Sequence, residues 1–138
     1  MLVYKTKVID KKAFVNYFFT DNQLIKAGYI LAGLHTNKND YITDYNDFKE
    51  ILTKKYGSPK NEQTLWKNDL YKDDHSHWGL AISIGHLKYF SAWETDNTEI
   101  LNFLSGDNYH ILCGVQYRSK SLKEIEIKGN EKKALKQF

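Results

Sequence analysis

The first third of the chain alternates between apolar and polar positions, a period of two that is typical of β-strands. The pattern predicts strands over residues 2–9, 13–20 and 24–33, separated by turns at Asp10 and at Asp21-Asn22. In the second of these stretches both faces are apolar, which is typical of a strand inside a sheet. We therefore expect an antiparallel three-stranded meander.

A period close to 3.6 follows and predicts an amphipathic helix over residues 44–56. Asp44 is the expected N-cap, Gly57 supplies a left-handed cap, and Pro59 prevents continuation. The apolar stripe of this helix consists of Phe48, Ile51, Leu52 and Tyr56.

Residues 77–93 fit either period, so their length has to decide. An apolar run this long favours a buried helix over residues 76–92, and two short strands joined at Gly85-His86 are the alternative. Further strands are expected over residues 98–104 and 109–118, with a short extended piece at 64–71.

These elements predict an α+β fold: an antiparallel sheet of five to six strands with one or two helices packed on one face. Residues 1–118 form a single domain in this interpretation. Residues 119–138 form a basic tail, partly disordered or weakly helical, with Leu122, Ile125 and Leu135 as apolar anchors.

Composition narrows the function classes. The single cysteine, Cys113, excludes an intramolecular disulfide. The net charge of +3 comes from the tail, because residues 1–118 hold equal numbers of basic and acidic residues. Arg118 is the only arginine in the chain, so the bidentate contacts that read guanine are scarce and sequence-specific nucleic-acid binding is disfavoured.

No stretch approaches the roughly 20 apolar residues of a membrane span, and Lys5 and Lys7 come too early for a signal peptide. The sequence as written predicts a soluble cytoplasmic protein. Export or a lipid anchor is the alternative if a further segment precedes Met1.

The segment from Asp73 to His77 is the most metal-like in the chain. If it is extended, His75 and His77 point the same way and could chelate a transition metal with Asp73. The competing interpretation is a solvated loop that caps the next element.

Other chemistry is weaker. Cys113 and His110 fall on opposite faces of the predicted strand, so Cys113 is expected to be a buried thiol. Glu94, Asp96 and Glu99 could act as paired carboxylates in glycoside hydrolysis, but a solvated turn is the favoured interpretation, because nothing marks a partner that would raise a pKa. Common nucleotide-binding and hydrolase motifs are absent, and no cofactor is expected.

Aromatic residues are abundant, and tyrosine and tryptophan favour recognition surfaces. Four of them lie in or beside loops near the ends of the predicted helix and are expected to line an exposed groove. They are Tyr41, Tyr45, Trp66 and Tyr71.

Four blocks carry a resemblance to a known group. They are YFFTDNQLIKAGY at 17–29, FKEILTKKYGSP at 48–59 with Trp66 after it, WETDNTEIL at 93–101 and GDNYHILCGVQYRS at 106–119. The chain resembles an uncharacterised family of small Gram-positive bacterial proteins and domains without a known activity. The resemblance covers residues 14–120 and implies an architecture but no site.

We therefore expect a non-enzymatic binding or accessory domain that recognises a protein or a surface component. One alternative is an immunity-type protein that neutralises a toxin partner. Others are a small metal-dependent hydrolase that uses His75 and His77, and a homodimer formed through a sheet edge.

Overall fold

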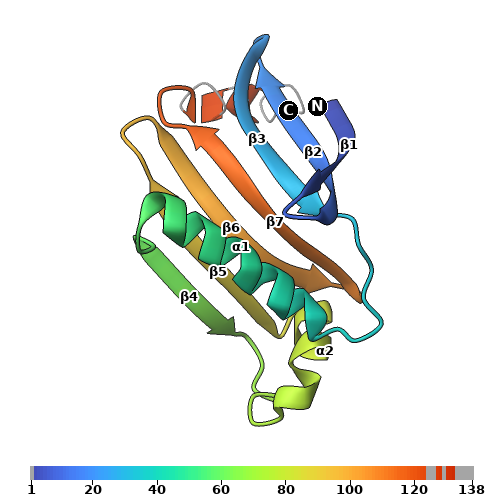
Figure 1. The fold of residues 1–138 in the computed structure, drawn as a ribbon. Coiled ribbons are helices and arrows are strands. Elements are labelled where there is room, and N and C mark those ends of the chain that lie inside the picture. The colour runs from blue at the N-terminus through green and yellow to red at the C-terminus, as the bar shows by residue number, and fades with distance from the viewer. Residues whose placement is uncertain (1, 124–126, 129, 133–138) are drawn as a thin grey trace.

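The computed structural model describes residues 2–123, 127–128 and 130–132. Within these residues seven strands form one antiparallel sheet in the order β1-β2-β3-β7-β6-β5-β4 (Figure 1). The strands are β1 (Leu2–Val8), β2 (Lys11–Thr20), β3 (Gln23–Leu31), β4 (Asn61–Trp66), β5 (Leu87–Glu94), β6 (Thr98–Asp107) and β7 (His110–Ser119). The helices are α1 (Asp40–Tyr56), the 3-10 helix η1 (His75–His77) and α2 (Trp78–Ser83).

The α+β class and the N-terminal meander are confirmed, whereas the sheet is larger than expected. Asp21 and Asn22 both have positive φ, 52° and 61°, as a tight hairpin between β2 and β3 requires. The sheet has seven strands rather than five to six. The difference arises in residues 77–93, where a single helix was expected.

That helix prediction is wrong in its second half. α2 ends at Ser83, Gly85 takes a φ of 80°, and the chain continues as β5. Leu87 and Trp93 are buried in β5 while Lys88 between them is exposed, a period of two. Gly85 makes the change of direction possible, because residues other than glycine rarely adopt this φ.

The C-terminal end of α1 agrees with the prediction and its beginning does not. Gly57 follows the helix with a φ of 88°, and its amide donates to the Thr53 carbonyl at 2.9 Å. The helix begins at Asp40, four residues before the expected Asp44. Asn39 stands at the N-cap position, but its side chain bonds to the α2 region instead of capping α1.

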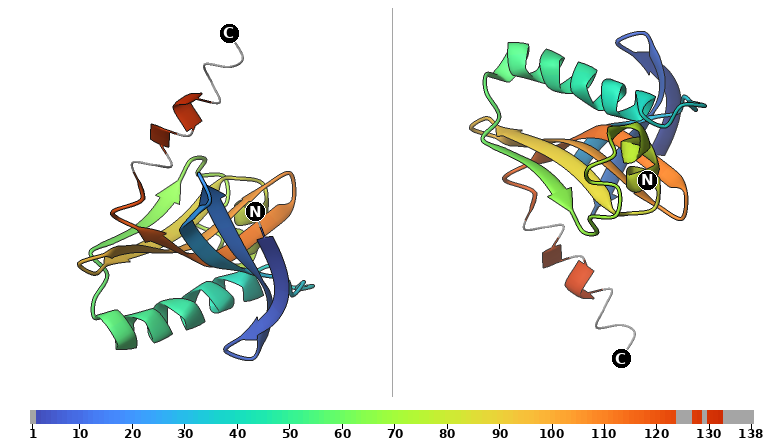
Figure 2. Two further views of the ribbon diagram at one scale, coloured as in Figure 1. Left: turned by 90° about the horizontal axis from the view of Figure 1, so that it is seen from above. Right: turned by 90° about the horizontal axis from the view of Figure 1, so that it is seen from below.

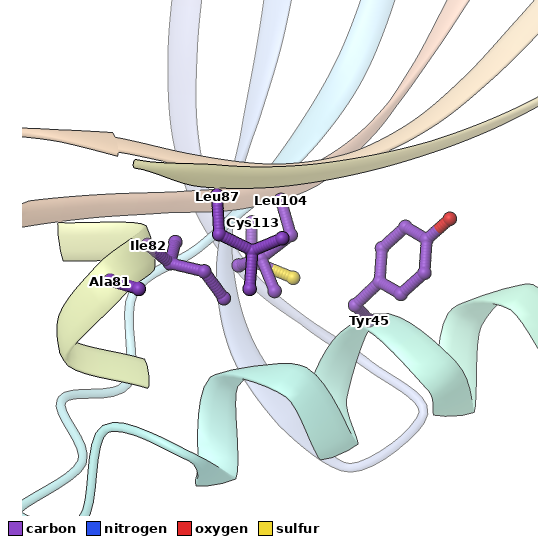
Figure 3. Packing of buried hydrophobic residues seen from close by; sticks show 6 residues of the cluster. All are labelled: Tyr45, Ala81, Ile82, Leu87, Leu104 and Cys113. Carbon is purple, nitrogen blue, oxygen red and sulfur yellow. The ribbon is translucent and has the colours of Figure 1, made fainter. Parts of the chain in front are cut away.

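The core lies between the sheet and the helices on one face. α1 runs across β6 and β7, and the β1–β2 end of the sheet curls toward the side of α1 (Figure 2). Side chains from α1, α2 and three strands meet in this space (Figure 3). One cluster is made of Tyr45, Ala81, Ile82, Leu87, Leu104 and Cys113, and a second of Phe48, Leu52, Trp93, Ile100 and Val115.

The described pieces of the C-terminal segment are helical at residues 127–128 and 130–132. They leave the sheet on the side opposite α1 (Figure 2). The predicted anchors Ile125 and Leu135 lie outside the described residues. No helix in the described part of the chain is long and apolar enough to cross a membrane.

Candidate functional site

The face of the sheet opposite the helices, which we call the open face, is covered by neither α1 nor α2 (Figure 2). Strand alternation decides which side chains it carries. In β5, Leu87, Ser91 and Trp93 are buried on the helix side, so Lys88 and Phe90 belong to the open face. The same alternation, carried from strand to strand by the pairing register, shows which side chains of the other strands lie on the open face.

An apolar row crosses five strands of the open face. Register pairing from β2 to β5 brings its members side by side: Phe14, Ile30, Gly114, Phe103 and Phe90. A Cβ at Gly114 would lie 2.2 Å from the Tyr29 backbone oxygen and 3.1 Å from atoms of the Ile30 and Phe103 side chains, so glycine is required by the close approach of β3 and also makes room for these two side chains. All four large side chains remain partly exposed. Contiguous exposed apolar surface is a common mark of an interaction site.

Lysines border this apolar row. Alternation places Lys5 and Lys7 of β1, Lys12 of β2 and Lys88 of β5 on the open face. Within the described residues none of these four lysines forms an ion pair. The open face therefore presents uncompensated positive charge around an apolar centre.

The predicted carboxylates Glu94 and Glu99 meet at one corner of the open face. They pair across β5 and β6 and line a cavity of about 600 Å³. The hydrogen bond from Lys60 lowers the pKa of Glu94, and the charge of Lys120 lowers it further. A carboxylate that stays ionised suits a cationic neighbour better than proton donation to a glycosidic oxygen. Asp96 lies in the exposed turn before β6.

Tyr45 is a core residue, which corrects its predicted place in an exposed groove. It is 2% exposed and its hydroxyl hydrogen-bonds the Ser91 hydroxyl. Burial raises the pKa of Tyr45 to about 12. The reason is helical spacing, because Tyr45 precedes Phe48 and Leu52 on the stripe of α1 that faces the sheet.

The other three predicted groove residues lie at the edge of the hydrophobic cluster that contains Tyr45. Tyr41, Trp66 and Tyr71 are partly exposed and pack against the same hydrophobic cluster as Tyr45. The described residues form four cavities that we compared, and none of these three side chains lines any of them. Their role in binding stays a prediction. In the structure they pack at the edge of the hydrophobic core.

The metal hypothesis for His75 and His77 rested on an extended segment, and that premise is wrong. The two residues lie in the 3-10 helix η1, where the His75 ring packs 4.4 Å from Trp78. His77 Nδ1 lies 2.6 Å from an Asp74 carboxylate oxygen instead. Among the described residues no group of three or more His, Cys, Asp or Glu side chains is placed to hold a metal ion.

Cys113 is buried, as the alternation of its strand predicted. It is 2% exposed, and burial raises the pKa of its thiol to about 12. His110 lies at the exposed beginning of β7. A neutral thiol without an adjacent base is a packing residue rather than a nucleophile.

Asp44 forms a polar cluster that the sequence did not indicate. It is 6% exposed and bonds His35 Nε2 at 2.6 Å and Lys11 Nζ at 2.8 Å. Tyr41 completes the group, because its hydroxyl accepts from the His35 amide. The cluster ties β2 and the loop after β3 to α1, a contact between segments that no local pattern reveals.

The open face was also missed, although its signal was present. Phe14 and Phe18 alternate with the core-facing residues of β2, and this apolarity on both faces was interpreted as burial inside a sheet. β2 is paired on both sides, yet neither α1 nor α2 lies on its second face. Two-sided apolarity in a strand therefore indicates either burial or a binding surface.

Comparison of the chain with protein-family models, with curated proteins and with solved structures finds no match in any of the three. The resemblance noted in the sequence stays a prediction.

Proposed function

We propose that the protein is a non-enzymatic binding protein that recognises a protein partner through the open face. The observation that carries this proposal is the in-register apolar row from Phe14 to Phe90, which neither α1 nor α2 covers. A sheet face with an apolar centre and a charged border matches the anatomy of protein interfaces.

Charge defines the chemistry of the partner. Lys5, Lys7, Lys12 and Lys88 border the row without ion pairs among the described residues, and Glu94 and Glu99 of this face already bind lysines, which leaves Asp107 at the end of β6 as its remaining carboxylate. A partner with an apolar patch and an acidic border complements this surface. An immunity-type protein would be one case, in which the partner is a toxin. Metal-dependent hydrolysis is not proposed, because His77 pairs with Asp74 and His75 packs on Trp78.

The test is site-specific photocrosslinking in cells of the source organism. A photoreactive residue replaces Leu112 on the open face, which is 52% exposed, or Ile51 on α1, which is 45% exposed. We expect one protein adduct from position 112 and none from position 51. Lys12→Glu with Lys88→Glu should abolish the adduct, whereas Lys54→Glu on α1 should leave it unchanged.

Three outcomes would contradict the proposal. Adducts from position 51 alone would move the interface to α1. A nuclease-sensitive adduct would show a nucleic acid instead of a protein on the face. An adduct of twice the mass of the chain would show self-association.

A further inference from the structure

A second cavity, of about 650 Å³, lies at the end of the sheet where β4, β5 and β6 meet the turn after α2. Its lining does not include the apolar row, but Lys88 belongs both to this cavity and to the border of the open face. The residues that line it are Leu65, Lys67, Asn68, Ile84, Gly85, His86, Lys88, Ser105, Gly106 and Asp107.

Strand register concentrates hydrogen-bond donors in this cavity. Leu65 lies opposite Lys88, and the Lys67 amide donates to the His86 carbonyl at 2.8 Å. Alternation therefore turns the Lys67 and Lys88 side chains toward the same face of the sheet. Neither ammonium group has an ion-pair partner among the described residues.

His86 adds an unexplained polar atom. Its Nδ1 is buried and has no hydrogen-bond partner in the described structure, and its ring stacks on Tyr71 with centroids 6.3 Å apart. Buried polar atoms are nearly always paired, so the unpaired Nδ1 of a residue that lines the cavity points to a missing partner. An oxygen atom of a ligand would satisfy a protonated Nδ1.

The remaining walls fit a ligand with a small apolar part. The Asn68 side-chain oxygen accepts from the Leu70 amide, which leaves its NH₂ group as a donor. The Ser105 hydroxyl is a further donor, and Leu65 and Ile84 supply apolar surface. Asp107 is the one carboxylate in the lining, against two ammonium groups. The excess of donors and positive charge selects an oxyanion.

We propose that this cavity binds the phosphate or carboxylate group of a small anionic ligand, held by Lys67 and Lys88 with His86 as a third donor. A phosphate matches two ammonium groups better than a monocarboxylate, because it carries more charge and more acceptor oxygens.

The experiment is an NMR titration of the full chain with sodium phosphate and, separately, sodium acetate. Sodium chloride keeps the ionic strength constant, and the readout is the backbone amide shifts of Gly85, His86 and Gly106. We expect saturable shifts with phosphate. Saturation by acetate alone would assign the site to a carboxylate ligand and would still support oxyanion binding.

Two variants test the assignment of the donors. Lys67→Gln with Lys88→Gln should lower the affinity for the titrated anion by at least about tenfold, because two charged hydrogen bonds are lost. His86→Phe preserves the stacked ring but removes the Nδ1 donor, so it should lower the affinity for the anion by a smaller factor. Lys54→Gln with Lys55→Gln on α1 makes the same change in net charge and should leave affinity unchanged.

The proposal fails if neither anion saturates, or if the Lys67/Lys88 double variant titrates like the wild type. It also fails if the α1 control weakens binding as much as the cavity variant, since attraction by net charge would then explain the effect.

Discussion

At the scale of single residues, polar side chains inside the core orient α1 on the sheet. Ser91 and Asn102 have no exposed surface, and both bond to Tyr45: Ser91 to its hydroxyl, and Asn102 to its backbone oxygen at 3.2 Å. Apolar packing alone would tolerate sliding of the helix, whereas these two bonds fix its position. Such buried bonds are costly to leave unmade, so they favour one arrangement.

Cys113 gives a prediction about alkaline pH. Its pKa is about 12 in the folded protein against 9.0 for an ordinary thiol, so the unfolded chain loses this proton first as the pH rises. The free energy of unfolding should therefore fall between about pH 9 and about pH 12. Between about pH 8 and about pH 10, the free energy of unfolding should fall by about 1 kcal/mol more in the wild type than in the Cys113→Ala variant.

Urea unfolding at the two pH values measures this difference. Cys113→Ala loses packing at both pH values, and the tyrosines titrate in both proteins, so the comparison isolates the thiol. If the free energy of unfolding depended on pH equally in the two proteins, burial of the thiol would not be the cause of the pH dependence.

At the scale of elements, the contact between α1 and α2 depends on Asn39 and Gly79. The Asn39 side-chain oxygen accepts from the Gly79 amide at 2.7 Å, and its NH₂ group donates to the His75 carbonyl at 3.1 Å. This use of Asn39 explains the wrong helix start, because the residue at the N-cap position serves a distant segment. Local cap rules cannot identify such a partner.

Gly79→Ala should destabilise the protein. The added Cβ would lie 2.2 Å from the Lys38 carbonyl carbon, which belongs to the backbone and has little freedom to move. We expect a loss of about 1–3 kcal/mol in the free energy of unfolding, the range of overpacked sites. Chemical denaturation measures it.

Gly33→Ala is the matched control, because nothing lies within 4 Å of a Cβ at Gly33. Its stability should change by less than about 1 kcal/mol. If both variants lost the same amount, close approach at Gly79 would not be the cause.

At the scale of the whole molecule, strand order sets the distribution of stability. β7 is paired on both sides and contains the buried residues Cys113, Gly114 and Val115. β1 is an edge strand, and six of its seven residues are exposed. The protein should therefore open from the β1 edge before its centre opens.

Hydrogen exchange tests this order. The amides of β6 and β7 that bond across the sheet should exchange more slowly than those of β1 by on the order of a hundredfold or more. Similar rates in the two regions would mean that the sheet opens only as one unit.

The sequence predicts contacts between neighbours in the chain better than contacts between distant segments. The meander, the Gly57 helix end and the buried Cys113 follow from local spacing and are confirmed. The open face depends on which strands a helix covers, and the Asp44 cluster joins residues 33 positions apart. The two-sided apolarity of β2 signals the open face but does not distinguish it from burial, and the Asp44 cluster has no local signature, so both candidate cavities and the apolar row required the structure.

The place of β7 in the sheet has a consequence for synthesis. β7 lies between β3 and β6, although it is the last of the seven described strands to be synthesised. Until it emerges, the meander and the β4–β6 unit have no strand pairing between them, and each presents an unpaired edge. The sheet therefore closes only after the last of these seven strands is made, and until then the edges of β3 and β6 that β7 pairs with are exposed and prone to aggregation.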